Sequence, residues 1–150
     1  MAEIREPQKA NAIEKKNKII EAGLRAFGEK GYYKTTTVEI AKLAGVSTGI
    51  VYSYFKDKKD ILLHALRLYF ANVFRPMEET LKTMTGSVDI EAEARSLIQI
   101  AIQSHRENLA AHEEMIAMSH LDKDVHSRFM ELEHEITETV SSYLEAGGVR

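Results

Sequence analysis

The sequence contains no cysteine among its 150 residues. This absence excludes disulfide bonds, a thiol nucleophile and thiolate metal sites, and it gives weak support to a reducing compartment. The chain also lacks an apolar run of about 18 residues, because His64 and Arg67 interrupt the best candidate at 61–74. The first residues, MAEIREPQK, have no apolar signal core. We therefore expect a cytoplasmic protein with no membrane partner.

Proline is scarce, with two residues, and no stretch alternates apolar and polar residues as a strand does. These two features predict an all-α fold. Hydrophobic residues make up 44% of the sequence, which is too much for a disordered chain. The length and this composition suit one or two small domains with a real core.

Charge is distributed unequally along the chain. Residues 1–70 hold 13 Lys and Arg against 8 Asp and Glu, whereas residues 71–150 hold 7 against 15. The first part therefore carries a net charge of +5 and the second −8. This split is typical of a DNA-binding head on a body that does not bind DNA, although solvated helix faces give similar splits by chance.

Two helices and a turn are predicted near the N-terminus, after a polar arm of residues 1–11. Apolar residues recur at helical spacing in NAIEKKNKIIEAGLRAFGEKG, and Gly31 supplies the stop. Thr36 and Glu39 have the spacing of a capping box that opens a second helix. Gly45 can end this helix in the left-handed conformation, Val46 can fill the angle between helices, and Ser47 can cap the next helix. The pattern predicts a helix-turn-helix.

The third helix, from Thr48 to about Phe55, has an uncharged outer face. Val51 and Phe55 form its inward pair, so the opposite face centres on Gly49 and Ser53. A helix that enters the major groove needs a small residue for close approach, and hydroxyls or methyls for the base edges. This face has that composition.

Tyr52 and Tyr54 leave an alternative open. They can contact DNA from this short helix, or they can pack against neighbouring helices as ordinary core aromatics. The preceding turn favours the first interpretation.

A fourth helix is predicted to bridge two parts of the chain. Asp57 and Asp60 repeat the capping pattern, and an apolar stripe continues until Pro76 interferes. Lys58, in the first turn, lies beside unpaired backbone donors that favour a phosphate, although a solvated lysine is the default interpretation.

Beyond that proline we expect further helices at 77–85, 89–106, 108–119 and 123–146, with Gly86 and Gly147-Gly148 as breaks. The predicted organisation is a flexible arm at 1–11, a three-helix helix-turn-helix domain at 12–57, and a C-terminal helical bundle within 58–150 that the fourth helix joins to the head.

The stretch TTTVEIAKLAGVSTGIVYSYFKDKKDIL, together with the upstream IIEAGLRAFGEKGYYKTT, resembles the DNA-binding motif of the TetR/AcrR family of transcriptional regulators. The resemblance covers about residues 13–66, and the remainder matches only as helices. It implies a sequence-specific regulator, by default a repressor that a small molecule releases from its operator, with no cofactor. The positions it assigns to double-stranded DNA are Thr36, Thr37, Ser47, Thr48, Gly49, Ile50, Tyr52, Ser53, Tyr54 and Lys58.

Ile50 departs from the family pattern, which usually has a small or hydroxylated residue there. Its side chain cannot donate a hydrogen bond, so it can meet a thymine methyl or simply pack at the helix edge. Both interpretations stay open.

In the family, the later helices form a ligand-binding domain. The resemblance therefore suggests a pocket, although apolar positions in a bundle are more often core. Its suggested lining is Phe70, Phe74, Ile98, Ile102, His105, His112, Met115 and Met118.

Metal binding and catalysis find little support in the sequence. His105 and His112 are seven residues apart but are expected to flank a helix break, and no histidine pair has a tight ligand spacing. No strained nucleophile turn, phosphate-binding glycine loop or helix-borne metal motif organises the remaining polar residues. We expect a protein without a metal site and without enzymatic activity.

One helix-turn-helix reads too few base pairs to find a single genomic site, so such modules act as dimers on half-sites about 34 to 36 Å apart, or a multiple of that. The family continues past EAGGVR with two helices that form its dimer interface, whereas this sequence ends at Arg150. The resemblance thus implies a homodimer and a chain that is a fragment or incomplete. The alternatives are a ligand-independent nucleoid or division-associated DNA-binding protein, and a helical module that binds protein.

Overall fold

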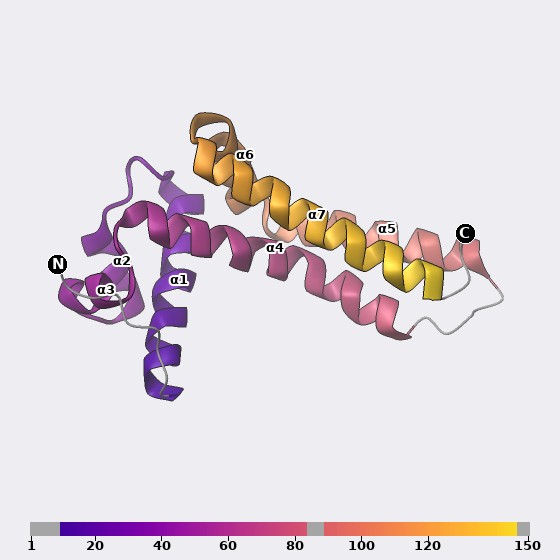
Figure 1. The fold of residues 1–150 in the computed structure, drawn as a ribbon, viewed down its shortest axis with the longest axis horizontal. Coiled ribbons are helices and arrows are strands. Elements are labelled where there is room, and N and C mark those ends of the chain that lie inside the picture. Colours follow the sequence, from indigo (N-terminus) through magenta and orange to yellow (C-terminus); the bar gives the residue numbers. More distant parts are fainter. Residues whose placement is uncertain (1–9, 84–88, 147–150) are drawn as a thin grey trace.

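Residues 10–83 and 89–146 are described by the structure, a computed structural model, and within them the chain forms seven α-helices and no strand. Figure 1 shows α1–α3 gathered around the first part of the long α4, with α5 and α7 beside its second part. The all-α prediction is confirmed. The helices are α1 (Ala10–Lys30), α2 (Thr37–Ala44), α3 (Thr48–Tyr54), α4 (Lys58–Thr83), α5 (Ile90–Glu107), α6 (Leu109–Leu121) and α7 (Lys123–Ala146).

Most predicted helix ends agree with the structure to within two residues. At the N-terminus, α1 already begins at Ala10, so the last two residues of the predicted arm are helical. Residues 1–9 of that arm lie outside the described residues, as do the predicted breaks at Gly86 and Gly147-Gly148.

The fourth helix does not stop at Pro76. It continues to Thr83, so the predicted interruption and the separate helix at 77–85 are wrong. A proline inside a helix removes one backbone donor and crowds the preceding turn. Here packing of α4 on both sides of the proline offsets that destabilisation, because Tyr69 is buried before it and Leu81 after it. Tertiary packing against α5 and α7 outweighs the local preference.

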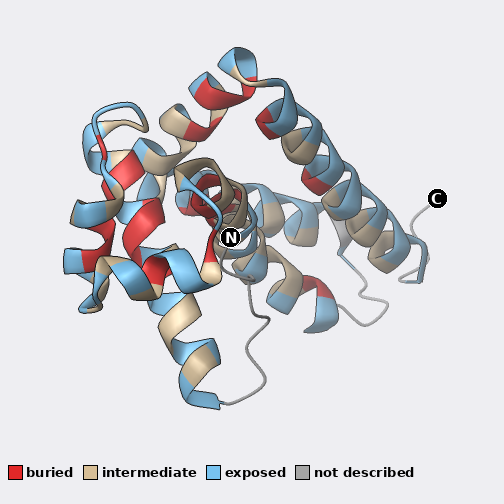
Figure 2. Ribbon diagram, turned by 60° about the vertical axis from the view of Figure 1, so that its left-hand side comes forward, coloured by how far each residue is buried: buried red, intermediate tan, exposed pale blue. Residues whose placement is uncertain are grey.

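One hydrophobic core joins the helix-turn-helix to the body. Phe27 of α1, Val51 of α3 and Leu62 of α4 belong to the same buried cluster as Met115 of α6 and Val125 of α7. Figure 2 shows this burial concentrated where α1–α4 meet and continuing onto α6 and the start of α7. The packing is therefore continuous across the predicted domain boundary at residue 57. A displacement of the body, the helices α5–α7, can thus be transmitted to the head, the helices α1–α3.

The turn between α2 and α3 generates a stability prediction. Gly45 has φ +69°, which an alanine adopts at a cost of about 1–2 kcal/mol. Gly49 has an ordinary helical backbone, and a Cβ there would meet only Ser47 Oγ at 3.9 Å. We expect Gly45→Ala to lower the free energy of unfolding by about 1 kcal/mol or more. The matched Gly49→Ala should leave it equal or higher, measured by urea denaturation, and equal losses in both would contradict this account.

Candidate nucleic-acid interface

Both short helices of the motif are held by side-chain caps. Thr36 Oγ1 accepts a hydrogen bond from the Glu39 N–H, and the Glu39 carboxylate accepts one from the Thr36 N–H, so the predicted capping box is confirmed. Ser47 Oγ accepts the Ile50 N–H and caps α3 as predicted. The Lys30 ammonium, followed by the N–H and hydroxyl of Thr36, lowers the pKa of Glu39 to about 2. The Glu39 carboxylate of the capping box therefore stays ionised at any physiological pH.

The α3 helix buries one face and exposes the other. Val51 is fully buried, and so is Phe55 directly after the helix. On the opposite side Gly49 and Ser53 are exposed, and Tyr52 keeps 46% of its surface accessible. No charged residue occurs between Thr48 and Tyr54. The predicted uncharged face is thus open to solvent and free of competing ion pairs.

A hydrogen bond ties α2 to α3 on this exposed side. Thr37 Oγ1 and the Tyr52 hydroxyl lie 2.9 Å apart. Thr36, one residue earlier, is exposed. The structure therefore brings the predicted DNA-contacting residues at the start of α2 together with those of α3 on one surface.

Two predicted contact residues lie partly inside. Ile50 and Tyr54 are half-buried and pack against the core cluster. Part of the Ile50 side chain therefore packs at the helix edge, and part of the Tyr54 side chain packs as a core aromatic, which were the alternatives to DNA contact. The exposed remainder still borders the face of Gly49 and Ser53.

Lys58 is engaged within the protein. Its Nζ donates to the Tyr32 and Thr35 carbonyls at 2.8 and 2.9 Å and lies 4.3 Å from the centre of the Tyr32 ring. The N-terminus of α4 also carries carboxylates, since Asp57 Oδ1 accepts the Asp60 N–H at 2.8 Å. A phosphate contact by Lys58 would require the ammonium to leave both carbonyls. In this structure Lys58 instead stabilises the turn after α1 through these two hydrogen bonds.

Other cations flank the exposed face. Lys34 in the turn after α1, Lys42 on α2 and Lys56 in the turn after α3 are all exposed. None of these three lysines was assigned to DNA from the sequence, because an isolated surface lysine has no motif that identifies it. Their charge suits the neutralisation of phosphates beside a groove-reading helix.

A cavity of about 400 Å³ lies in the body between α4 and the helices α5–α7. It contains four of the eight residues predicted for a ligand pocket, namely Phe70, Phe74, His105 and His112. Its further lining is Tyr69, Val73, Met77, Ala101, Phe129, Glu133, Ile136 and Thr137. The wall is therefore mainly aromatic and aliphatic, as small-molecule sites usually are.

The other four predicted lining residues lie elsewhere and need correction. Met115 and Met118 are buried in the core shared with the head. Ile98 and Ile102 stand on the outer face of α5, with 60% and 48% of their surface exposed. A stripe of apolar residues on a helix does not by itself tell which flank faces a cavity, and that ambiguity caused the error.

A tyrosine and two histidines are among the polar residues that line the cavity, together with Glu133 and Thr137. The Tyr69 hydroxyl is hydrogen-bonded to His112 Nδ1, and the rings of His105 and His112 are 5.2 Å apart. Burial raises the pKa of Tyr69 to about 12, whereas burial and then the neighbouring His105 lower the pKa of His112. Both groups are thus uncharged at neutral pH, which suits an apolar ligand with a hydrogen-bonding group.

The predicted helix break between the two histidines is confirmed at Asn108, where α5 ends and α6 begins. Among residues 10–83 and 89–146, no group of three or more His, Cys, Asp or Glu is placed to hold a metal ion. Within the same ranges, no helix is long and apolar enough to cross a bilayer.

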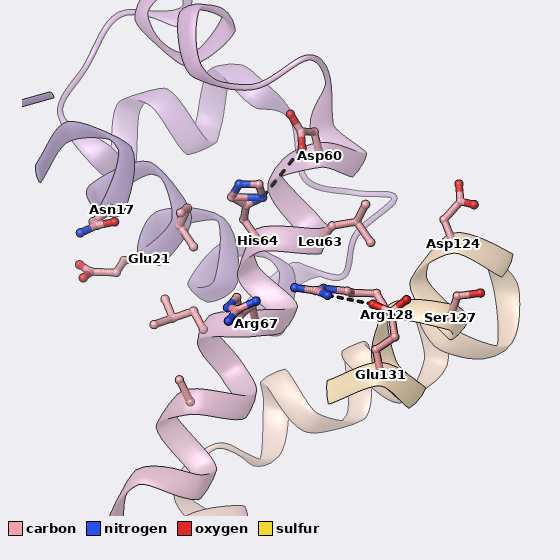
Figure 3. Close-up of a pocket in the computed structure, with 13 residues that line it drawn as sticks. Asn17, Glu21, Asp60, Leu63, His64, Arg67, Asp124, Ser127, Arg128 and Glu131 are labelled. Atoms are coloured by element: carbon pink, nitrogen blue, oxygen red, sulfur yellow. Dashed lines mark hydrogen bonds and ion pairs between the residues drawn. The ribbon is translucent and has the colours of Figure 1, made fainter. Parts of the chain in front are cut away.

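A second, larger hollow of about 770 Å³ lies between α1, α4 and α7. Figure 3 shows His64 beside Asp60, and Arg128 beside Glu131, on its walls. Arg67 and Glu21 also line it. Nothing in the sequence indicated this cleft, because its lining comes from three helices far apart in the chain.

The arrangement of α1–α3, with an exposed uncharged helix after a glycine turn, defines the class of helix-turn-helix DNA-binding proteins. Comparison with known proteins gives the family. Residues 19–65 match the model of the bacterial regulatory proteins of the tetR family. The chain is 30% identical over 126 residues to the fatty acid metabolism regulator protein of Bacillus subtilis. The matched region covers 84% of this chain and 60% of that protein.

Two further likenesses agree with this result. The HTH-type transcriptional regulator HbdR of Aromatoleum is 50% identical over 54 residues, 36% of this chain and 24% of that protein. A TetR-family transcriptional regulator from Mesorhizobium loti shares the fold, with a TM-score of 0.83 at 23% identity over 92% of this chain and 70% of its own. Residues 19–65 therefore form a domain of the tetR family of bacterial regulatory proteins, and the chain spans 60% of the length of the Bacillus subtilis relative.

The exposed α3 face generates a DNA-binding prediction. Because a methyl group at Gly49 would meet only Ser47 Oγ in the free protein, at an ordinary contact distance of 3.9 Å, Gly49→Ala should lower operator affinity about tenfold without lowering stability. Tyr52→Phe should also weaken binding, because it removes the hydroxyl paired with Thr37. Fluorescence anisotropy with labelled DNA measures both. Unchanged affinity in both variants would contradict the assignment of this face to DNA.

Proposed function

We propose that this protein is a sequence-specific DNA-binding transcriptional repressor that an apolar small molecule releases from its operator. The observation that carries the proposal is the open, uncharged face of α3, held rigidly by the caps at Thr36 and Ser47. Such a face contributes little to solubility, whereas it suits the edges of bases in the major groove. The flanking lysines then supply contacts to phosphates that fix the register.

We propose that DNA contact involves Thr36, Thr37, Gly49, Tyr52 and Ser53 directly. Ser47 acts by capping, and Ile50 and Tyr54 border the groove with their exposed parts. Recognition of a full operator requires two heads, so the proposed active form is a homodimer on two half-sites.

The cavity in the body favours a ligand-responsive regulator over a ligand-independent nucleoid protein, for which a filled body is expected. Its aromatic wall includes Phe70 and Phe129, whose rings are 4.9 Å apart, and its polar groups include the Tyr69–His112 pair. This chemistry suits an apolar molecule with one hydrogen-bonding group. The Bacillus subtilis relative, named as a regulator of fatty acid metabolism, is compatible with an apolar effector here.

Release requires the effector to prefer the state that does not bind DNA. A hundredfold preference between the two states corresponds to about 2.7 kcal/mol, which an apolar ligand in a 400 Å³ cavity can supply. Because α4 lines the cavity and also packs on α1, a change at the cavity can alter the position of the head.

Selection of DNA from a random pool, followed by footprinting, tests the DNA-binding proposal. A single enriched sequence, bound with an affinity that falls steeply between low and moderate salt, is the expected result. Affinity without sequence preference favours the nucleoid alternative, and salt-independent or absent DNA binding favours a protein-interaction module.

The cavity generates a separate prediction. Ala101→Phe, on the wall of the cavity, should abolish release of the selected DNA by cell extract while leaving the basal footprint intact. Ile98→Phe is the matched control, because it adds bulk one turn earlier on the exposed face of the same helix. Equal response to extract in both variants and in the unchanged chain would show that the effector binds elsewhere.

A further inference from the structure

We infer that Glu114, on α6 of the body, is a positioning residue for the DNA-reading head: it holds the turn between α1 and α2 through the backbone of Tyr32. The inference rests on the proposed DNA-binding function and names the contact by which the body acts on it. The Tyr32 N–H donates to Glu114 Oε1, across 82 positions of the sequence.

The site of this contact is shaped by glycines. Gly31 has φ +85°, so the chain leaves the helical conformation there, and the Tyr32 N–H points instead to the half-buried carboxylate. A hydrogen bond from a backbone donor to an ionised acceptor is roughly twice as strong as a neutral one. This carboxylate therefore fixes the turn from the side of α6, while the Lys58 ammonium holds the Tyr32 and Thr35 carbonyls from α4.

The two helices also approach too closely for the contact to be incidental. A Cβ added at Gly28 of α1 would lie 3.1 Å from the Ala111 nitrogen of α6. Close approach at this point brings the Glu114 carboxylate, about one turn further along α6, to 3.6 Å from the place where a Cβ of Gly31 would be. The position of α6 thus dictates where the carboxylate stands.

From Tyr32 a series of contacts leads to the exposed face of α3. The Tyr32 carbonyl accepts Lys58 Nζ, which also donates to the carbonyl of buried Thr35. The Thr35 hydroxyl is within hydrogen-bonding distance of the Gly31 carbonyl at 2.8 Å. Two residues after Thr35, the Thr37 hydroxyl is hydrogen-bonded to the Tyr52 hydroxyl. A displacement of Tyr32 therefore moves the start of α2 and, with it, the residues proposed to contact DNA.

The same turn of α6 faces the cavity. His112, two residues before Glu114, lines it and is bonded to Tyr69 of α4. One short segment of α6 consequently touches the proposed ligand site with one side chain and the head with another. This juxtaposition makes Glu114 one point at which α6 acts on the head, beside the packing of Ala111 and Met115.

The variants Glu114→Gln and Glu114→Asp distinguish the effect of side-chain length from the effect of charge. Glutamine keeps the length and an acceptor oxygen but loses the charge, whereas aspartate keeps the charge but is about 1.5 Å shorter. Glu113→Ala, at the exposed neighbouring position, is the control for loss of an acidic side chain on α6. Two readouts apply to the full chain: affinity for DNA selected by the unchanged protein, and hydrogen exchange of the Tyr32 amide by NMR.

We expect Glu114→Asp to weaken DNA binding about tenfold and to speed Tyr32 exchange on the order of tenfold, with the unfolding midpoint little changed. Glu114→Gln, which keeps the acceptor but not the charge, should lose less than Glu114→Asp, about threefold in both measurements, and Glu113→Ala should match the unchanged protein. Wild-type affinity and exchange in Glu114→Asp overturn the inference, as does a loss in Glu114→Gln as large as in Glu114→Asp. If the unchanged protein selects no DNA, the proposed function fails, while Tyr32 exchange still decides whether Glu114 holds the turn.

Discussion

The proposed DNA-contacting surface of α3 depends on the burial of Val51 and Phe55. A helix of seven residues is too short to be stable alone, because the free-energy cost of helix nucleation exceeds the stabilisation from its few hydrogen bonds. Its position comes from these two side chains, both fully buried, each worth about 1.5–3 kcal/mol of transfer free energy. With the inner face anchored in this way, the outer face needs no charges or helix-favouring residues. It is free to carry glycine, serine and tyrosine.

The same core constrains what the body can do to the head. The cluster that holds Phe55 also contains Met115 of α6 and Val125 of α7, so there is no loose joint at the start of α4. At the surface of this junction, Lys59 of α4 pairs with Asp122 at 3.0 Å and also with Asp124. Continuous packing transmits small displacements rather than absorbing them. The proposed ligand in the body would therefore reorient the head without unfolding it.

Features specified by neighbouring residues were predictable from the sequence. The capping box of Thr36 and Glu39, the left-handed Gly45 and the Ser47 cap are each fixed within a few positions, and all agree with the structure. The amphipathic pattern of α3 likewise identified its inner pair. These signals are local, so one chain is enough to recognise them.

Features that depend on distant residues were not predictable. Pro76 was expected to interrupt a helix, yet packing on both sides carries α4 through it. The flank of α5 that faces the cavity could not be assigned, so Ile98 and Ile102 were misplaced. The Glu114 contact with Tyr32 spans 82 positions and has no sequence signature. In each case tertiary contacts decide among local alternatives of similar energy.

The most direct measurement of the central claim is an NMR titration of the isotope-labelled chain with the DNA that it selects. We expect the largest amide shifts between Thr36 and Tyr54, centred on Gly49 and Tyr52, with weaker shifts along α5 and α7. Shifts confined to α5–α7, or an unperturbed α3 in the presence of saturating DNA, would contradict that claim.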